Sequence, residues 1–219
     1  WGVSTRMIGA LIMVHGDDKG LKIPPRIAPH QVVIIPINSK NEEKEKFDNF
    51  VDMVHSKLKD NGMRCFIDDS NNGPGFKFNN WELRGAPLRI DIGLKEFESG
   101  NVTLCRRDTG EKEEMSLDKL STLPSILEDI QKGMYDSASS FVKENTFELH
   151  DYSEFKKLLS KENCFIKAYW DGSDDSELKI KEETKATIRC ILEDVKDPKL
   201  KCMFSGKPAK HLVVFAKAY

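Results

Sequence analysis

The sequence predicts an α/β fold in which a mixed β-sheet is flanked by helices and is followed by a smaller α/β unit. Residues 32–37 form a continuous apolar run, which is typical of a strand buried on both faces in a parallel or mixed sheet. Residues 41–61 carry apolar side chains at helical spacing, and residues 63–68 have the pattern of a second strand. This strand, helix and strand order defines the predicted class.

Two helices are predicted in the first quarter of the chain. Residues 4–14 place apolar side chains near helical spacing. The helix over residues 41–61 has one apolar stripe among charged residues and is closed by Gly62. The stripe consists of Phe47, Phe50, Val51, Val54 and Leu58.

A short helix and a strand are predicted next. The helix starts at Phe76 and must end by Gly85, because glycine favours the left-handed conformation that terminates helices. Residues 88–92 then alternate apolar and polar side chains. This alternation predicts a half-buried strand whose polar residues, Arg89 and Asp91, share one face.

The rest of the chain predicts one long helix and a second, smaller α/β unit. A strand is predicted over residues 102–107, and apolar side chains between residues 123 and 142 follow helical spacing for about six turns. We expect this long helix to end one domain and lead into the next. The later elements are helices near 151–160 and 176–186 and strands at 164–170, 187–192 and 211–215.

Composition excludes several classes of protein. With 34 basic and 36 acidic residues, the formal net charge is −2, so any contact with nucleic acid must be local. The longest apolar run, residues 8–14, is far shorter than the roughly 20 residues that a membrane span needs. We therefore expect no membrane partner. Because the chain begins at Trp1 rather than Met, we interpret it as part of something longer.

The cysteines indicate a reducing compartment, and hence a cytoplasmic location. Their number is odd and they form no close pair, which argues against a disulfide framework or a Cys-x-x-Cys site. Four of the five lie in apolar, strand-like runs and are predicted to be small buried thiols. These are Cys65, Cys105, Cys164 and Cys190; the fifth is Cys202.

Short motifs for phosphate, dinucleotide and metal binding are incomplete. Residues 205–207 suggest a phosphate loop, but Lys201 stands where a glycine is required, so a turn is predicted. Residues 73–75 lack the third glycine of a dinucleotide fingerprint. Residues 171–182 have Ser176 where a calcium loop needs glycine, so we expect a capped, solvated helix. The five histidines are scattered, and no metal site is predicted.

One stretch, residues 76–112, has the composition expected of an RNA contact. Aromatic side chains can stack on unpaired bases, while Arg and Lys can meet phosphates and base edges. Acidic residues in the same stretch almost cancel its charge, so composition alone leaves the prediction open. The basic residues are Lys77, Arg84, Arg89, Lys95, Arg106, Arg107 and Lys112, and the aromatic ones are Phe76, Phe78, Trp81 and Phe97.

Longer motifs resemble a known family of enzymes. Residues 1–9 and 13–18 read WGVSTRMIG and MVHGDD, and resemble the third signature motif of class II aminoacyl-tRNA synthetases in its prolyl-tRNA synthetase form. The remaining motifs resemble the anticodon-binding and C-terminal domains of the eukaryotic and archaeal type of that family. They read LKIPP, VVIIP, PGFKFNNWELRG, RRDTGEK and SGKPAK, near a terminal Tyr219.

The resemblance implies domains at residues 1–27, the end of the catalytic domain, at 28–145, the anticodon-binding domain, and at 146–219, a zinc-binding-like domain. It also implies an enzyme, a homodimer in the family, that uses ATP and Mg²⁺ to activate proline and transfers it to tRNA. Because signature motifs 1 and 2 are not in this sequence, we expect the chain alone to be inactive in proline-dependent pyrophosphate exchange.

By resemblance, three residues near the start belong to the active site. Arg6, with Thr5, matches the position that binds ATP phosphates, where a fixed guanidinium suits the triphosphate charge. Without the flanking motif, an arginine capping a helix would be the simpler interpretation. Gly2 lies where the family lines its proline pocket, and a residue without a side chain leaves room for the substrate.

The resemblance also assigns the anticodon site. Proline codons begin with CC, so the tRNA presents two guanines, whose edges offer both acceptors and donors and therefore suit a cation together with a carboxylate. Glu96 replaces the usual Asp and Leu94 the usual Pro of a loop, which leaves the Glu96 contact open. The positions implied are Phe78, Glu82, Arg89, Lys95 and Glu96.

Alternatives remain for two of these side chains and for the chain as a whole. Phe78 could pack in the core, and Glu82 could pair on its helix with Arg84 or Arg89. The chain could also be a stand-alone accessory RNA-binding protein or a small nucleotide-binding protein. Of the four zinc-binding cysteines that many family members have, only Cys202 persists, so no zinc is expected.

Overall fold

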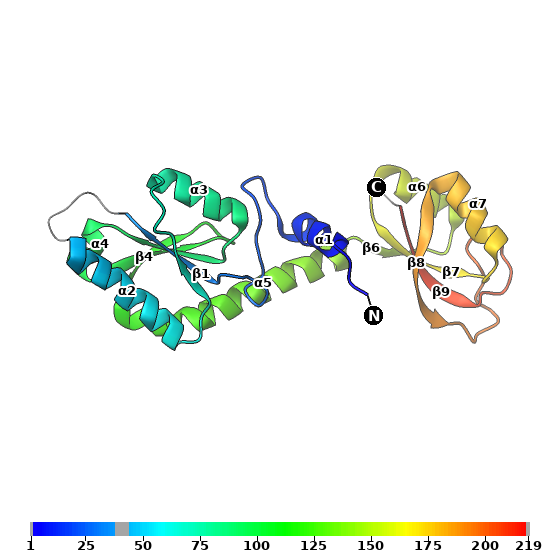
Figure 1. The fold of residues 1–219 in the computed structure, drawn as a ribbon. Helices are drawn as coiled ribbons and strands as arrows, with labels where there is room; N and C mark the ends of the chain where they lie inside the picture. Colours follow the sequence, from blue (N-terminus) through cyan, green and yellow to red (C-terminus); the bar gives the residue numbers. More distant parts are fainter. Residues whose placement is uncertain (1, 38–43, 218–219) are drawn as a thin grey trace. The chain divides into compact units, whose positions relative to one another are not determined.

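The computed structural model describes residues 2–37 and 44–217, which fall into two compact units, Trp1–Asp136 and Ser137–Tyr219. Within these described ranges, no helix combines the length and apolar character needed to cross a membrane. Trp1, the first three residues of the helix predicted over 41–61, and Tyr219 lie outside the described residues. Figure 1 shows the elements of each unit.

The first unit is built on a mixed sheet, as the sequence predicts, and this sheet has five strands. Its order is β2-β1-β3-β4-β5. The first strand pairs in parallel with both of its neighbours, whereas the β3–β4 and β4–β5 pairs are antiparallel. The strands are β1 (Val32–Pro36), β2 (Cys65–Ile67), β3 (Leu88–Ile92), β4 (Asn101–Arg106) and β5 (Lys112–Ser116).

One face of this sheet carries the main hydrophobic core. It is covered by α2 (Lys44–Asp60) and by the first turns of α5 (Leu123–Glu144), which begins in the first unit and ends in the second. All five residues of the predicted apolar stripe on α2 are buried. The strand residues that they cover are Val32, Ile34, Leu88, Ile90, Ile92, Val102, Leu104 and Met115.

The opposite face is only partly covered. Helix α3 (Pro74–Arg84) buries Trp81 against Val33 and Ile35 of β1. Beyond β1 the same face becomes polar, because the residues of β3, β4 and β5 that lie in register with Val33 and Ile35 are polar. We call this surface the polar face; its two rows are Arg89, Cys105 and Lys112, and Asp91, Thr103 and Glu114.

The strand β3 is more buried than its alternation predicts. Arg89 is half-buried, but Asp91 is only 6% exposed. The reason is that β3 lies in the middle of the sheet, and the side chain of Arg89 folds over Asp91 to pair with it.

The expectation that Lys95 and Glu96 lie in a loop is wrong. They belong to a short helix, α4 (Leu94–Ser99). Glu96 makes this helix possible because its Oε2 accepts a hydrogen bond from the Gly93 amide at 3.0 Å, and Gly100 ends it in the left-handed conformation. The mostly charged edge strand β5 and a 3-10 helix, η1 (Leu117–Thr122), were also not expected.

A segment before β1 is fastened to the end of α3. It follows α1 (Arg6–His15), the predicted N-terminal helix. The amides of Leu21 and Ile23 donate to the carbonyls of Leu83 and Gly85, at 3.0 and 3.1 Å. The approach is so close that a Cβ on Gly20 would lie 2.5 Å from the backbone of Leu83. Glycine is therefore required at this crossing.

The second unit is the predicted smaller α/β unit. Its four-stranded sheet has the order β6-β7-β9-β8 and packs against two helices. The sequence did not predict the short strand β6. The elements are β6 (Thr146–Glu148), α6 (Tyr152–Lys161), β7 (Phe165–Trp170), α7 (Asp174–Thr184), β8 (Ala186–Asp194) and β9 (His211–Lys217).

The prediction that Cys190 is buried is wrong. Cys190 lies on β8, an edge strand whose second half is exposed, whereas Cys105 and Cys164 are buried and Cys65 is partly buried. A strand at the edge of a sheet has one face and one side open to solvent, so its apolar pattern does not report burial. All five cysteines are free thiols.

Candidate nucleic-acid interface

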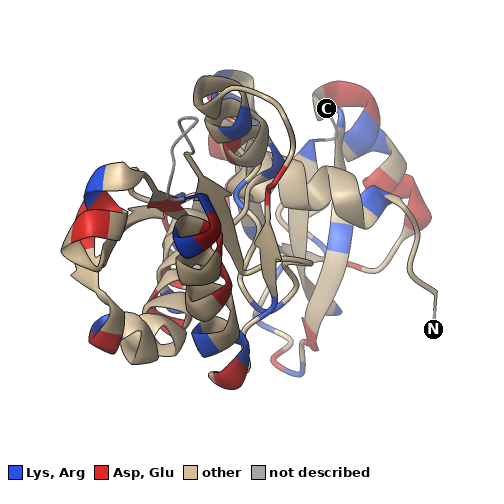
Figure 2. Ribbon diagram, turned by 60° about the vertical axis from the view of Figure 1, so that its left-hand side comes forward, with Lys and Arg blue, Asp and Glu red and all other residues tan. Residues whose placement is uncertain are grey.

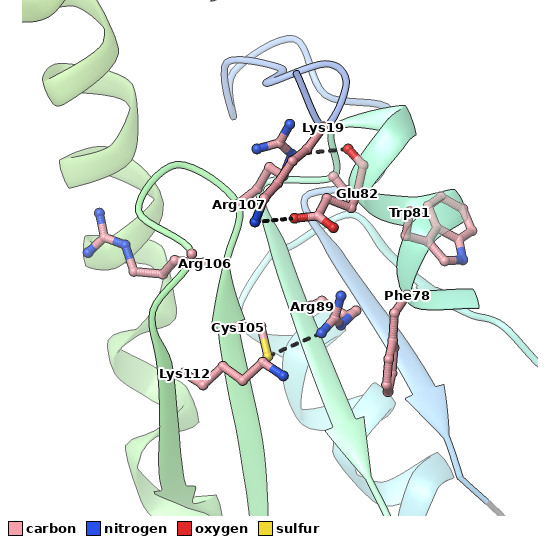
Figure 3. Close-up of a pocket in the computed structure, with 11 residues that line it drawn as sticks. Lys19, Phe78, Trp81, Glu82, Arg89, Cys105, Arg106, Arg107 and Lys112 are labelled. Atoms are coloured by element: carbon pink, nitrogen blue, oxygen red, sulfur yellow. Dashed lines mark hydrogen bonds and ion pairs between the residues drawn. The ribbon is translucent and has the colours of Figure 1, made fainter. Parts of the chain in front are cut away.

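The first unit has a pocket of about 270 Å³ where the C-terminal half of α3 meets the polar face. Figure 3 shows the side chains that surround it. Three of the residues implied by the family resemblance, Phe78, Glu82 and Arg89, line this pocket. The other lining residues are Lys19, Trp81, Ala86, Cys105, Arg106, Arg107, Gly110 and Lys112.

Helix α3 is fixed in place by a buried carboxylate. Asp68 follows β2, and its Oδ2 accepts a hydrogen bond from the indole Nε1 of Trp81 at 2.7 Å. The ammonium of Lys77 donates to the Asp68 carbonyl at 2.7 Å and lies 3.8 Å from its carboxylate. Burial alone would raise the pKa of Asp68, but hydrogen bonds from Ser70 and Trp81 lower it below its usual value.

Arg89 is held between an aromatic ring and a carboxylate. Its guanidinium lies 4.2 Å from the centre of the Phe78 ring, and its Nε and Nη2 donate to Asp91 at 2.8 and 3.2 Å. Burial works against its charge, but Asp91 outweighs this effect and raises the pKa of Arg89. Burial, aided by Asp91, also raises the pKa of the neighbouring Cys105 to about 11, so this thiol stays protonated. The guanidinium is thus charged and oriented before any ligand arrives.

Phe78 itself lies at the edge of the apolar cluster between α3 and β1. It is half-buried and packs against that cluster, while one side of its ring faces Arg89. Figure 3 shows this ring and the guanidinium side by side. Core packing and a role in the pocket are therefore both compatible with its position.

Glu82 pairs with a residue that the sequence did not suggest. Its Oε1 lies 3.4 Å from the ammonium of Lys19 rather than against Arg84 or Arg89. Arg84 instead lies over the ring of Trp81, at 5.0 Å. The side chain of Glu82 is about one-third exposed, at 34%, so its carboxylate can be reached from the pocket.

Arg107 joins the N-terminal segment to the pocket wall. Its Nη1 and Nη2 donate to the carboxylate of Asp17 at 2.9 and 2.6 Å, and its Nε donates to the carbonyl of Glu82 at 3.0 Å. This bidentate pair holds the pKa of Asp17 well below its usual range. Arg107 is therefore a structural residue of the site.

Lys95 and Glu96 do not line the pocket, but they border the same polar face. Glu96 Oε1 accepts a hydrogen bond from Thr103 at 3.0 Å, and the exposed ammonium of Lys95 lies 3.6 Å from Glu114. Burial would raise the pKa of Glu96, but its bonds to backbone amides and to Thr103 lower it. Both oxygens of Glu96 are thus engaged within the protein.

Several residues of the stretch 76–112 have structural roles instead. Lys77 and Trp81 are buried against Asp68, and Phe97 packs against α2 in the main core. Arg106 pairs with Asp108 at 2.7 Å and points away from the other side chains in Figure 3. Lys112 is exposed at the rim. Charged residues of both signs alternate over most helices, as Figure 2 shows.

The residues implied for an active site lie apart from this pocket, at the start of α1. Arg6 is the first residue of the helix, and Thr5 precedes it as the N-cap without a side-chain cap hydrogen bond. Both are exposed, as is Gly2, which has open space around it. The capping role considered for Arg6 does not apply, because Thr5 holds the cap position.

In the second unit, the carboxylate of Asp171 cross-links two segments of the chain. Asp171 Oδ1 accepts hydrogen bonds from the hydroxyls of Ser173 and Ser176, and Oδ2 accepts one from Ser205 at 2.6 Å. Burial opposes ionisation, but these bonds lower the pKa of Asp171 to about 2. Among the described residues, no group of three or more His, Cys, Asp or Glu side chains is arranged to hold a metal ion.

Comparison with known proteins defines the class of the first unit. Residues 31–123 match the family model described as "Anticodon binding domain", and residues 152–219 match "Prolyl-tRNA synthetase, C-terminal". The sheet with the pocket is therefore an anticodon-binding domain of the kind found in aminoacyl-tRNA synthetases.

Full-length comparisons define the family. Proline–tRNA ligases of Chlorobium phaeobacteroides, Cytophaga hutchinsonii and Phocaeicola vulgatus are 47%, 46% and 45% identical to this chain over all of its length. The chain belongs to the prolyl-tRNA synthetase family. It covers 47%, 45% and 45% of those proteins, and so spans about half the length of the curated relatives it matches.

Proposed function

We propose that this chain is the anticodon-recognising part of a prolyl-tRNA synthetase, with the anticodon loop of a proline tRNA as its partner. The observation that carries the proposal is the pocket on the polar face, where Arg89 is fixed beside Phe78 and a reachable carboxylate, Glu82, lies on the same helix as that ring. The family models that match both units support it.

Each group has a chemistry that suits guanine. The edge of guanine presents the O6 and N7 acceptors and the N1 and N2 donors. Arg89 offers N–H donors in a fixed plane, and Glu82 offers an acceptor once it leaves Lys19. Phe78, which is half-buried and covered on one side by Arg89, offers the remaining exposed part of its ring to an unpaired base.

Lys95 and Glu96 would act at the border of the site. The side chain of Lys95 is 80% exposed, and its ammonium can reach a phosphate or a base acceptor. Each oxygen of Glu96 already accepts a hydrogen bond, from Gly93 or from Thr103, so a base would have to share these acceptors. We propose that Lys95 contributes more than Glu96 to binding.

The longer enzyme would use ATP and Mg²⁺ to activate proline before transferring it to the tRNA. From this chain, Arg6 and Thr5 would contact the triphosphate, and Gly2 would border the proline pocket. A guanidinium at an exposed helix start suits phosphate oxygens. For that enzyme we also propose a homodimer, on the family resemblance alone, and a cytoplasmic location, which the cysteine usage favours. We propose no zinc in the second unit, because Cys202 alone remains of the four zinc-binding cysteines.

The proposal is tested by equilibrium binding of the chain to a proline anticodon stem-loop. The comparison is with the same stem-loop in which adenines replace the two guanines. Each good bidentate base contact is worth about 1 to 3 kcal/mol of discrimination, so the guanine stem-loop should bind at least about tenfold more tightly. Equal affinities for the two stem-loops would contradict the proposal.

A further inference from the structure

The second unit carries a basic hairpin between β8 and β9 that the anticodon site does not use. We define the basic hairpin as residues 195–210, where Asp197 is the one acid. Its five lysines are all exposed, and none of their ammonium groups pairs with a carboxylate of a described residue. They are Lys196, Lys199, Lys201, Lys207 and Lys210.

The hairpin is a rigid scaffold rather than a loose loop. The amide of Cys202 donates to the carbonyl of Lys207 at 2.8 Å, and that of Ala209 donates to Leu200 at 2.9 Å. Cys202, Met203 and Ala209 are buried, and the Met203 amide donates to the carbonyl of Tyr169 on β7. The lysines therefore project from an ordered backbone, so binding a ligand costs little conformational entropy of the hairpin.

An aromatic pocket of about 370 Å³ adjoins the basic hairpin. His150 and Tyr169 stack with ring centres 5.4 Å apart and planes 13° apart, and Lys199, Leu200, Lys201 and Cys202 complete the lining. The His150 side chain is 63% exposed, so one face of the stack is open to solvent. The carboxylate of Glu148 lies 3.6 Å from His150.

We propose that the basic hairpin and the His150–Tyr169 stack form a second RNA-binding surface, which contacts a single-stranded or looped part of a tRNA outside the anticodon. Lys199, Lys201 and Lys207 would neutralise backbone phosphates, and an unpaired base would extend the aromatic stack. The inference rests on the proposed function only in taking tRNA as the RNA. It adds a binding site on the second unit, remote in sequence from Phe78 and Arg89.

The combination of groups favours RNA over an acidic protein segment. Lysines alone would suit either ligand, but a pocket lined by a stacked aromatic pair matches the face of a base. The charge segregation in this unit supports the same assignment, because α7 alone carries five acidic residues, Asp174, Asp175, Glu177, Glu182 and Glu183, whereas the hairpin carries five lysines.

The test is the salt dependence of tRNA binding by the full chain. Each phosphate neutralised contributes about −0.7 to −0.9 to the slope of log affinity against log salt. The triple variant Lys199→Gln, Lys201→Gln, Lys207→Gln should therefore flatten the slope by about 2 and weaken binding about tenfold or more at 0.1 M salt. Tyr169→Leu should weaken binding about fivefold with no change in slope, since stacking is uncharged.

A matched control removes the same charge elsewhere on the unit. Lys161→Gln, Lys179→Gln, Lys181→Gln changes three exposed lysines at the C-terminal parts of α6 and α7 and should leave the slope within about 0.5 of the parent. The proposal is overturned if the hairpin variant binds like this control. It is also overturned if Tyr169→Leu has no effect, or if polyglutamate competes for the chain as well as RNA of equal charge does.

The same measurements test the anticodon site and the second RNA-binding surface independently of each other. The hairpin contribution should be the same for tRNAs with and without the two guanines, because it reads no anticodon base. Loss of guanine discrimination with a retained hairpin effect would contradict the anticodon site alone. Retained discrimination with no hairpin effect would contradict the second surface alone.

Discussion

The guanidinium of Arg89 lies 4.2 Å from the centre of the Phe78 ring and forms a bidentate pair with Asp91. Two successive elements, the helix α3 and the strand β3, thus supply one preorganised group. Because the charge of Arg89 is already balanced by Asp91, the pocket can present an oriented donor without a strong positive field. This explains how a chain of net charge −2 can offer a local RNA contact.

Phe78→Leu should weaken anticodon binding more than it weakens the fold. Leucine keeps apolar contact with the cluster of α3 and β1, so the free energy of unfolding should fall by less than about 1.5 kcal/mol. Loss of the aromatic face should lower the binding free energy for the anticodon stem-loop by about 1 to 3 kcal/mol. Fluorescence anisotropy and urea unfolding measure the two effects. The matched control is Phe76→Leu, an exposed ring two residues earlier.

Arg107→Met should destabilise the first unit. The side chain of Arg107 is only 6% exposed and satisfies Asp17, which the variant would leave without its partner. Because Asp17 is about one-third exposed, the loss should be about 2 kcal/mol, below the range for fully buried pairs. Arg106→Met removes an arginine whose side chain is more exposed than that of Arg107, and it should cost less than about 1 kcal/mol in the same urea titration. Equal losses of unfolding free energy in the two variants would contradict the structural role of the Arg107–Asp17 pair.

The second unit should lose stability in acid through Asp171. Its pKa is about 2 in the folded chain, against an ordinary value of 3.8, so the stabilisation is present above pH 4 and is lost as pH falls toward 2. The difference in unfolding free energy between the parent and Asp171→Asn should shrink by about 2 kcal/mol from pH 5 to pH 2. Urea titrations followed by residue-resolved NMR of β7 and β9 measure it. A difference that does not change with pH would contradict the cross-linking role.

Cys190 should react with a thiol reagent far faster than the other four cysteines. It is exposed on the edge strand β8, whereas burial raises the pKa of Cys65 and Cys105 to about 11. One equivalent of fast labelling is expected for the native chain, and Cys190→Ser should abolish it. Fast labelling that persists in this variant would show that another thiol is accessible.

The elements whose signal is local were predictable from the sequence. The apolar run that becomes β1 and the stripe of α2 report burial through spacing along a few residues. The glycine after α3 marks the end of that helix, and the alternation of β3 marks a strand. Charged β5 and three-residue β6 have no such signal, because an edge strand needs few apolar side chains.

The pairs that build the candidate site were not predictable in this way. Asp17 and Arg107 are 90 residues apart, and Lys19 reaches Glu82 from a segment before the domain. Nothing in the local pattern of either partner indicates the other, so contacts of this kind require the fold. The bond from Gly93 to Glu96 is local, and a glutamate three residues after a glycine could have suggested the helix α4.

The measurement that tests the central claim most directly is the affinity of Arg89→Ala and Arg89→Lys for the proline anticodon stem-loop, with the adenine-substituted stem-loop as reference. Far-UV circular dichroism and thermal melting establish that each variant is folded. We predict that both variants lose about 1 to 3 kcal/mol of binding to the guanine stem-loop and keep the affinity of the parent for the reference, because lysine cannot reproduce the planar fork of arginine. Binding of the guanine stem-loop by folded Arg89→Ala as tightly as by the parent would contradict the account.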